Sequence, residues 1–386
     1  MLQEKAYWLA WSQIPGIGPI LLKRIQQKFG QLSQAWSLPV TELGQVEGFG
    51  EKIISKVQGE RSKINPERLL EDHLKDNPQF WTPADPEYPQ LLLEIPSPPP
   101  VLYYRGQVQL QENLGIFCAI AIVGTRYPTE YAKRWTSRIS KTLTEQGFII
   151  VSGMAAGIDA EAHWSCLKAS GRTIAVLGTG VDTIYPHSNQ KLYQQIEQEG
   201  LILSEYPANT KPDRGNFPAR NRIIAGLSRA VLIMEAPQKS GALITARFAN
   251  DFCRDVYVLP GTLDNQQSLG CLDLLNRGAQ VILGENHLLE MLQTIPMLDP
   301  SLRSEPALSL SESKLNIGSS QQKNRDFSHL EPELAQIMSI MTVESLTLDA
   351  IAEKTGLDTS KLLASLSQLE LMGLISQLPG MRYCAI

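Results

Sequence analysis

Short apolar runs alternate with helix-like segments through the middle of this chain, and this alternation constrains the fold more than any other feature. The runs lie at residues 119–123, 148–151, 173–177, 201–203, 230–234, 256–259 and 279–283. The segments between them have helical periodicity, as in Pro128–Gln146 and Ser188–Glu199. Strands that are apolar along their whole length are buried on both faces, and parallel strands need crossover helices. The pattern predicts an α/β domain over residues 116–295, with a mostly parallel sheet covered on both faces.

The residues before this domain have the composition of an extended lead-in. Prolines recur between residues 77 and 100, and the segment ends in EIPSPPPVLYYRG. A residue that precedes proline disfavours the helical conformation, so we expect a proline-rich lead-in over 66–115 that contains no helix over 77–100. Within the α/β domain, Pro128 suits a first helical position, and Gly147 and Gly171 suit helix ends.

The first 65 residues hold an internal repeat. IPGIGPILLKRIQ (14–26) aligns with VEGFGEKIISKVQ (46–58), and each segment has two glycines followed by a short helical pattern. This resembles two helix–hairpin–helix units, in which glycines bring backbone N–H groups close to a phosphate. The alternative is a helical packing domain that contacts no nucleic acid, because the hairpins carry few cations: Lys23, Arg24, Lys52 and Lys56. Both interpretations predict an all-helical domain over 1–65.

The C-terminal part divides into a linker and a small domain. Residues 296–328 are rich in serine, proline and other polar residues, which is typical of a flexible linker. Residues 329–386 predict two helices joined by a turn at Gly356 and then a short strand pair, a winged helix-turn-helix pattern. The expected recognition helix, Asp358–Leu371, has Lys361 as its only base. A protein-interaction module is therefore favoured over a strong DNA-binding element.

The composition indicates a soluble globular protein. The net charge is −5 and the pI is about 5.7, so basic surface has to be local. The five cysteines are scattered without a C-x-x-C pair, which predicts neither a disulfide framework nor a metal site. The N-terminus lacks a signal-peptide pattern, and there is no apolar run of about 18 residues that would span a membrane. We expect a cytoplasmic location.

Small and polar residues follow the predicted strands. Gly124, Thr125 and Arg126 follow the first strand, Ser152, Gly153 and Gly157 follow the second, and Ser240 and Gly241 lie after the fifth. Ligands of open parallel sheets bind at the carboxyl ends of the strands, where glycine turns let backbone N–H groups approach an anion. The fingerprints G-x-G-x-x-G and G-x-x-x-x-G-K-[ST] are absent, so neither a dinucleotide cofactor nor ATP hydrolysis is predicted.

Arg126 is the strongest single candidate for a ligand contact in these loops. A guanidinium at a loop tip suits a phosphate, whereas the alternative is an ion pair with Asp159 or Glu205. Asp159 and His163 lie four residues apart on one predicted helix and could form a general-base pair. A helix N-terminal acid and a buried histidine with satisfied hydrogen bonds are the favoured interpretation of these two residues.

A basic island lies between residues 211 and 229 of this acidic chain. Its five cations are Lys211, Arg214, Arg220, Arg222 and Arg229, and its one acid is Asp213. In its centre, FPARNRIIAGLS (217–228), Phe217 precedes two arginines, and a base stacked on an aromatic ring contributes ~1–3 kcal/mol. This predicts a site for bases and phosphates, with Arg126 and Arg222 as the first contacts and Arg214 next. The alternative is that Arg220 and Asn221 brace loops and Arg222 alone faces the ligand.

Seven motifs in order strengthen this interpretation. AIVGTR, IVSGMAAGIDAEAH, TIAVLGTGVDTIYP, LSEYP, FPARNRIIAGLS, EAPQKSGALITA and VYVLPG occur between residues 121 and 261. Together they resemble the DNA-processing protein A family, also called DprA or Smf. The resemblance implies a Rossmann-like doubly wound domain between a helical N-terminal domain and a winged-helix tail. It further implies a protein without enzymatic activity that binds and protects incoming single-stranded DNA during natural transformation and loads RecA onto it.

The resemblance also implies site residues and partners. The family's Gly-Ser-Arg-type loop matches Gly124-Thr125-Arg126, and its basic loops match Arg214 and the run from Arg220 to Arg222. Family members often carry a lysine where this chain has His187, with Lys191 one turn further on, which weakens one phosphate contact at neutral pH. The expected DNA-binding set is Gly124, Thr125, Arg126, Ser152, Gly153, Gly157, His187, Lys191, Arg214, Phe217, Arg220, Asn221, Arg222, Ser240 and Gly241. RecA, single-strand-binding protein and a second copy, docked through the Rossmann-like domain, are the implied partners, with contacts within 238–290.

Two other functions stay open on the sequence. One is an enzyme acting on nucleotide monophosphates, because cytokinin-riboside-phosphate hydrolases have a similar core; residues 238–245 lack their P-G-G-x-G-T-x-x-E glycine run and glutamate. The other is a transcription factor that uses the winged tail, against which the weakly charged recognition helix counts. No cofactor is expected for the favoured function.

Overall fold

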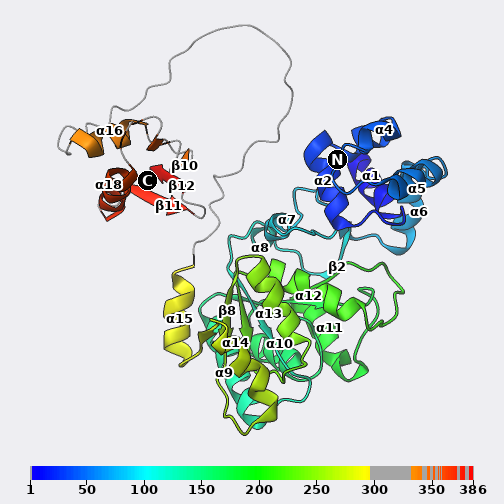
Figure 1. Ribbon diagram of the computed structural model, residues 1–386. Helices are drawn as coiled ribbons and strands as arrows, with labels where there is room; N and C mark the ends of the chain where they lie inside the picture. Colours follow the sequence, from blue (N-terminus) through cyan, green and yellow to red (C-terminus); the bar gives the residue numbers. More distant parts are fainter. Residues whose placement is uncertain are drawn as a thin grey trace. The chain divides into compact units, whose positions relative to one another are not determined.

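The computed structural model describes residues 2–295 without interruption. In the C-terminal part it describes residues 332–340, 346–347, 351–352, 355, 357, 359–371, 374–378 and 382–385. The chain divides into two compact units, Met1–Ser304 and Glu305–Ile386 (Figure 1). The linker expected at 296–328 and the turn expected at Gly356 lie outside the described residues.

The N-terminal part is helical up to Asp76. Its helices are α1 (Leu2–Ser12), α2 (Pro19–Phe29), α3 (Leu32–Ser37), α4 (Val40–Leu43), α5 (Glu51–Arg61) and α6 (Pro66–Asp76). Gly16 and Gly48 occupy equivalent turns with φ of 95° and 93°, a region that favours glycine. Gly18 and Gly50 are then the N-caps of α2 and α5. The two repeats are therefore equivalent helical hairpins.

Two hairpin cations are satisfied by the protein itself. The Lys23 ammonium donates to the carbonyl oxygens of Leu93 and Ile95 at 2.8 and 2.7 Å. Arg24, from the first hairpin unit, donates to the Glu47 carbonyl of the second at 2.9 Å and pairs with the Glu47 carboxylate at 3.3 Å. These contacts tie the hairpins to each other and to the rest of the unit, which favours the packing interpretation of this region.

A nine-stranded sheet forms the centre of the N-terminal unit, in the order β1-β2-β6-β5-β4-β3-β7-β8-β9. Its parallel strands are β3 (Ala119–Val123), β4 (Ile149–Ser152), β5 (Thr173–Leu177), β6 (Leu201–Ser204), β7 (Ala230–Ile233), β8 (Asp255–Val258) and β9 (Gln280–Val281). The chain winds from β3 outward to β6 and then returns to the other side of β3 for β7, β8 and β9. The predicted Rossmann-like, doubly wound sheet is confirmed, and the strand order reverses between β3 and β7.

The segment before the parallel strands belongs to the same sheet. β1 (Phe80–Trp81) pairs with β2 (Leu102–Gly106), and β2 pairs with β6, in both cases antiparallel. Two short helices, α7 (Gln90–Glu94) and α8 (Leu110–Asn113), also form here. The expectation of an extended lead-in without a helix over 77–100 is wrong, because α7 buries Leu92 in the same core as Tyr88 and Ile95.

Alternate strand residues face opposite helical layers. Ala121 and Val123 of β3 pack in the cluster that holds the buried residues of α12 (Asn216–Gly226) and α13 (Ala242–Asp251), beside α14 (Leu269–Asn276). Ile120 and Ile122 face α9 (Glu130–Glu145), α10 (Ile158–Lys168) and α15 (Glu285–Gln293). On that second face α11 (Gln190–Glu199) covers β5 and β6.

Two helix boundaries differ from expectation. Pro128 precedes α9 instead of starting it, because the Thr129 side chain is the N-cap and accepts from the Ala132 N–H group. Gly147 does follow α9, with a φ of 81°. After α10 the left-handed position is taken by Ser170, with a φ of 56°. Gly171 is required for space, since a Cβ there would lie 2.0 Å from a side-chain carbon of Thr144.

The C-terminal unit contains two helices and a small antiparallel sheet among its described residues. These elements are α16 (Pro332–Ile340), α18 (Thr359–Leu371), β10 (Leu346–Thr347), β11 (Ile375–Leu378) and β12 (Arg382–Ala385), with the strand order β10-β12-β11. Leu362 and Leu366 of α18 are buried together with Ile337 and Tyr383. In the described part of the chain, no helix has the length and apolar character to cross a membrane.

Candidate nucleic-acid interface

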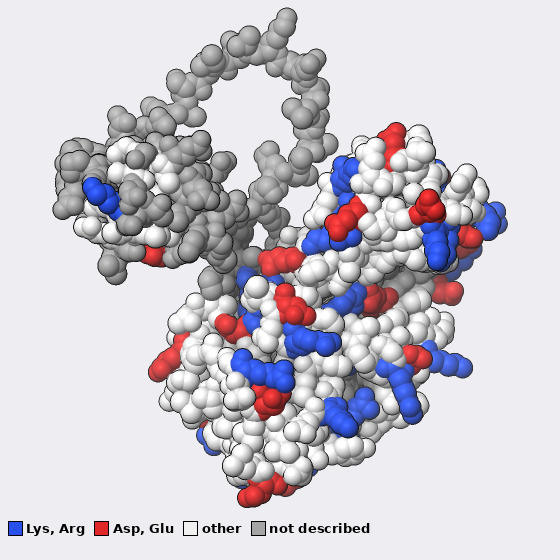
Figure 2. Space-filling model, viewed as in Figure 1, with Lys and Arg blue, Asp and Glu red and all other residues white. Residues whose placement is uncertain are grey.

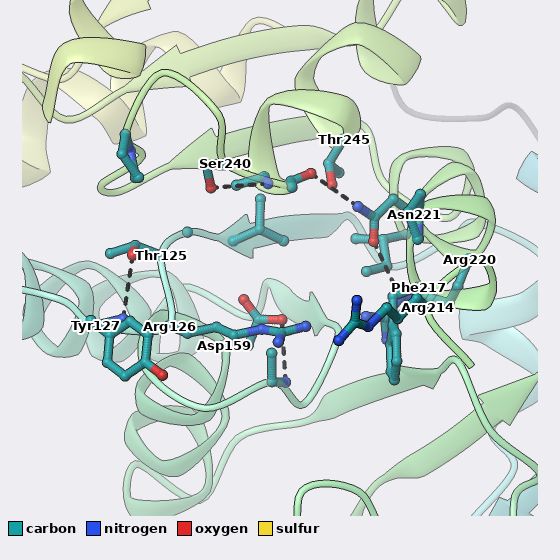
Figure 3. A pocket seen from close by; sticks show the side chains of 18 of the residues that line it. Thr125, Arg126, Tyr127, Asp159, Arg214, Phe217, Arg220, Asn221, Ser240 and Thr245 are labelled. Carbon is teal, nitrogen blue, oxygen red and sulfur yellow. Dashed lines mark hydrogen bonds between the residues drawn. The ribbon is translucent and has the colours of Figure 1, made fainter. Parts of the chain in front are cut away.

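A cavity of about 600 Å³ lies at the carboxyl ends of β3 and β7, where the strand order reverses (Figure 3). The loops after these two strands, the start of α13 and one face of α12 line it. A smaller cavity of about 170 Å³ adjoins it, and both are lined by Arg126, Tyr127 and Phe217. The position agrees with the expectation that ligands bind at the strand ends of such a sheet.

The loop after β3 presents Arg126 to the cavity. Gly124 is required there, because a Cβ would lie 2.6 Å from a side-chain carbon of Ile158. The Thr125 N–H group donates to the Glu235 carbonyl at 2.7 Å, which ties this loop to the end of β7. Arg126 is exposed, and its guanidinium carbon lies 5.8 Å from the centroid of the Phe217 ring.

Arg126 has no carboxylate partner within residues 2–295. Glu205, one of the two acids that could have paired with it, is bound to Arg222 instead. Asp159, the other, accepts backbone N–H groups of Gly153 and Ala155 at 3.2 and 3.4 Å. The guanidinium of Arg126 is therefore available to a ligand, as the phosphate interpretation requires.

Glu235 organises the loops around the cavity, although the sequence did not single it out for this. Its side chain is buried, and its carboxylate accepts from the Thr129 N–H and hydroxyl groups, each at 2.8 Å, and from the Asn265 amide at 3.0 Å. Because its own carbonyl accepts from Thr125, Glu235 joins the segments that follow β3, β7 and β8. A buried carboxylate with this many donors is a rigid positioning group.

The central motif FPARNRIIAGLS begins inside a helix. It was expected in a loop, but residues 217–226 belong to α12. Phe217, Arg220, Asn221 and Ile224 lie three or four residues apart, so they share one helical face, and this face lines the cavity. Arg222 lies about 200° around the helix from Arg220 and is not part of the lining.

The expectation that Arg222 faces the ligand is therefore corrected. Its side chain is buried, with the whole residue 8% exposed, and it forms a bidentate ion pair with Glu205. Its Nε also donates to the Ser97 carbonyl at 3.1 Å. The three groups are in different segments of the chain, so Arg222 joins α12 to the loop after β6 and to the proline-rich segment.

Arg220 is a buried cation that lines both cavities. It is 5% exposed and donates to the carbonyl oxygens of Gly153, at 2.8 Å, and Val176. Burial lowers the pKa of its guanidinium to about 10, with a further lowering from the charge of Arg126. Asn221 donates to the Gly241 carbonyl at 3.1 Å. Both residues brace loops, as one alternative proposed, but they also line the cavity.

Asp159 and His163 have different hydrogen-bond partners. His163 is fully buried, and its Nδ1 lies 2.6 Å from the Thr173 hydroxyl. Burial lowers the pKa of His163 to about 3. Burial also raises the pKa of the Asp159 carboxyl to about 6, although Arg220 and backbone N–H groups act in the opposite direction. Asp159 is the expected acid in the first turn of α10, but His163 is only partly satisfied, because its buried Nε2 has no hydrogen-bond partner.

The other expected residues divide into two groups. Gly124, Thr125, Arg214, Phe217, Ser240 and Gly241 line the larger cavity, and Gly153 lines the smaller one. Ser152, Gly157, His187 and Lys191 line neither. The Ser152 hydroxyl donates to the Ile122 carbonyl at 2.6 Å. Gly157 has a φ of 86°, and a Cβ there would lie 2.4 Å from the Thr125 carbonyl oxygen in the first loop. His187 and Lys191 are exposed.

Some lining residues were absent from the predicted set. They are chiefly Tyr127, Tyr185 and Thr245. The Tyr185 ring lies 5.3 Å from that of Phe217 and is inclined to it by 34°. Tyr127 directly follows Arg126, and an aromatic residue next to the sharpest candidate was a signal that could have identified it.

The charge of the larger cavity favours an anion. Arg126, Arg214 and Arg220 line it together with a single carboxylate, that of Asp159. On the face shown in Figure 2, acidic and basic side chains are interspersed over the N-terminal unit, without a continuous basic surface. The excess of positive charge in this site is thus local, as an acidic chain requires for an anion site.

Known protein families and proteins resemble this chain over most of its length. The family model described as DNA recombination-mediator protein A matches residues 79–293, and that of the DprA winged helix domain matches residues 321–381. The chain is 55% identical over 395 residues to Protein Smf of Synechocystis sp., covering 98% of each chain. The chain belongs to the DNA recombination-mediator protein A family.

Other members of this family extend the comparison. DNA processing protein DprA of Bacillus subtilis is 40% identical over 206 residues, which cover 53% of this chain and 68% of the relative. The crystal structure of DprA from Streptococcus pneumoniae superimposes with a TM-score of 0.65 at 32% identity, covering 74% of this chain and 97% of that one. The structure of the Helicobacter pylori protein, which concerns its single-stranded DNA binding mode, superimposes with a TM-score of 0.50 at 36% identity. The superposition covers 56% of this chain and 96% of that one.

Proposed function

We propose that this protein is a recombination mediator that binds single-stranded DNA in the cavity at the carboxyl ends of β3 and β7. The main support is that three arginines and two aromatic rings, Tyr185 and Phe217, meet there beside one carboxylate. Guanidinium groups suit phosphates, and bases of any sequence stack on aromatic rings. The combination fits a strand of nucleotides, whose charges and bases alternate.

Each group in the cavity has a proposed role. The exposed Arg126 and Arg214 bind backbone phosphates, and the buried Arg220 contributes a fixed positive charge beneath them. Phe217 and Tyr185 stack on bases. At the start of α13, the N-cap residue Gly241 contributes its backbone N–H group to the same anionic backbone, whereas the Ser240 N–H group already donates to the Pro237 carbonyl at 2.9 Å.

The family supports a wider role for the bound strand. The family is described as a recombination mediator, and the Helicobacter pylori relative binds single-stranded DNA. We propose that the present protein protects incoming single strands during natural transformation, loads RecA onto them in competition with single-strand-binding protein, and acts as a homodimer through the Rossmann-like domain. Binding rather than catalysis is its proposed activity, and Asp159 serves to hold the backbone of Gly153 and Ala155.

Binding to polythymidine tests this proposal. Fluorescence anisotropy would be measured for a labelled polythymidine strand and a matched duplex at several salt concentrations. We expect tight, salt-sensitive binding to the single strand and weak binding to the duplex. Arg126→Ala should weaken single-strand binding about tenfold and reduce the salt dependence by roughly 0.7 per lost phosphate contact.

Arg68→Ala is the matched control, because Arg68 is an exposed arginine on α6 whose side chain is 83% exposed and which lines neither cavity. It should leave the affinity unchanged. Absence of single-strand binding by the wild-type protein, or a preference for duplex, would contradict the proposal and favour a nucleotide-processing enzyme or a duplex-binding regulator.

A further inference from the structure

Tyr127 is an unusually exposed aromatic residue. At 82% it is the most exposed large hydrophobic side chain among the residues that the structure describes. An aromatic ring in water forgoes the favourable burial that most such rings obtain. Single exposed hydrophobic side chains are common on proteins, so exposure alone carries no inference. The position of Tyr127 and the rigidity of its backbone are what set it apart.

The backbone on both sides of Tyr127 is held in place. Its own N–H group donates to the Thr125 hydroxyl at 3.3 Å, as Figure 3 shows. On one side, Thr125 is bonded to the Glu235 carbonyl. On the other side, Thr129 donates twice to the Glu235 carboxylate, at 2.8 Å each. The ring therefore projects from a loop whose backbone is already fixed. A ligand that stacks on this ring loses little binding free energy to ordering the loop.

Tyr127 also lies beside the proposed path of the strand. It lines both cavities, and so does its neighbour Arg126, whose guanidinium extends toward Phe217 (Figure 3). Along a nucleic-acid strand, each phosphate is flanked by a nucleoside on either side. A phosphate held by Arg126, with one neighbouring base at Phe217, has its other neighbouring base on the side of Tyr127.

We propose that Tyr127 is a stacking platform for this outer nucleobase, at the mouth of the cavities. This inference rests on the proposed function and adds a contact to it. Stacking on an exposed tyrosine requires an unpaired, unstacked base, which a single strand provides and an intact duplex does not. Tyr127 thereby increases the preference for single strands, whereas Arg126 and Arg214 bind the phosphates that both forms carry.

Substitutions of Tyr127 separate stacking from charge. Tyr127→Ala, Tyr127→Leu and Tyr127→Phe would be titrated with a labelled polythymidine strand at several salt concentrations, and with an abasic strand of equal length. We expect Tyr127→Ala to weaken binding about tenfold, or ~1.4 kcal/mol, with an unchanged salt slope. The leucine variant should be nearly as weak, and the phenylalanine variant should bind like the wild type. When the abasic strand replaces polythymidine, the affinity of the alanine variant should fall less than the affinity of the wild type.

Phe117→Ala is the matched control. Phe117 is 43% exposed and lies two residues before β3, at the end of the strand opposite to Tyr127. The Phe117→Ala variant should bind polythymidine like the wild type, and size-exclusion chromatography should show the same oligomeric state for all variants.

A Tyr127→Ala variant whose polythymidine affinity is within twofold of the wild type, while that of Arg126→Ala is weakened, would overturn this inference and leave the proposed function intact. Loss of affinity accompanied by a changed oligomeric state would also overturn it, in favour of a contact between copies. No polythymidine binding by the wild type would overturn both proposals.

Discussion

Two regions of the N-terminal unit carry cations but use them in different ways. At the carboxyl edge of the sheet, Arg126 and Arg214 are exposed and have no carboxylate partner within residues 2–295. In the N-terminal hairpins, Lys23 donates to two carbonyl oxygens and Arg24 bridges to the other hairpin. The difference teaches that a basic residue is available to a ligand only where the folded chain does not already supply its acceptors.

Arg222 shows that this rule operates residue by residue. Arg222 lies on the same helix as Arg220, within the basic motif FPARNRIIAGLS. Its guanidinium nevertheless donates to Glu205 and to the Ser97 carbonyl, just as the guanidinium of Arg24 donates to acceptors within the hairpins. Residue type and neighbourhood in the sequence are therefore poor guides to which cations a ligand reaches. Substitutions in both regions can break or sharpen this comparison.

The largest expected effect is on stability, from Arg222→Ala. The change leaves the carboxylate of Glu205, whose side chain is only 17% exposed, without its partner. Removing one member of a buried pair costs ~3–5 kcal/mol, and the partial exposure of this one places it near the lower end. We expect a melting temperature lower by several degrees in calorimetry and an affinity for polythymidine within about twofold of the wild type. The double variant Arg222→Met with Glu205→Gln should recover part of the stability. A normal melting temperature together with weakened DNA binding would show that Arg222 faces the ligand after all.

A smaller effect is expected from Asp159→Asn, on the pH dependence. The pKa of Asp159 is about 6 in the folded protein, above its ordinary value near 4, because the carboxyl is buried. Between these values the folded state binds more protons than the unfolded state, so Asp159 makes stability fall as pH rises through this window. Below about pH 6 the carboxyl is neutral, and its repulsion of a phosphate is lost.

We therefore expect wild-type polythymidine affinity to rise a few-fold between about pH 7.5 and pH 5.5. In Asp159→Asn this rise should be largely absent, as anisotropy titrations at the two pH values would show. His187→Ala is the control, because His187 is an exposed histidine that lines neither cavity. A pH dependence that persists in Asp159→Asn and disappears in His187→Ala would assign it to the histidine instead.

The smallest effect is expected in the hairpins. Lys52→Glu combined with Lys56→Glu reverses the charge of two cations of the second hairpin helix, α5. Because Lys52 and Lys56 line neither cavity, polythymidine affinity should change less than about twofold at moderate salt, although both side chains are exposed. Loss of more than tenfold in the anisotropy titration, with an unchanged melting temperature, would show that the hairpins contribute to DNA binding. It would also break the comparison between the two regions.

Much of the fold followed from patterns that are local in the sequence. Each apolar run predicted as a strand overlaps one, although the last, at 279–283, holds only the two residues of β9. The glycines at 16 and 48 identified two equivalent turns, because a positive φ is a property of a single residue. The lead-in was misjudged because prolines dominate its local pattern, whereas the burial of Tyr88 and Leu92 against distant strands determines its structure.

The candidate site was predicted in its position but only partly in its members. The strand ends identified the edge of the sheet, and Arg126, Arg214, Phe217 and Arg220 all line the cavity there. Tyr127 and the organising role of Glu235 were missed, because their importance comes from exposure and from partners in other segments.

The sequence by itself determined the alternation of strands and helices, the paired hairpins, the edge of the sheet at which the cavity lies and the family resemblance. All of these depend on residue type and short-range spacing. Only the tertiary structure decided which arginine of α12 faces the cavity. That choice depends on the phase of the helix relative to the sheet and on acceptors at Ser97, Gly153 and Glu205, which lie 17 to 125 residues away along the chain. Contacts between such distant segments exist only once the chain has folded, and they determine which of its charges remain for a ligand.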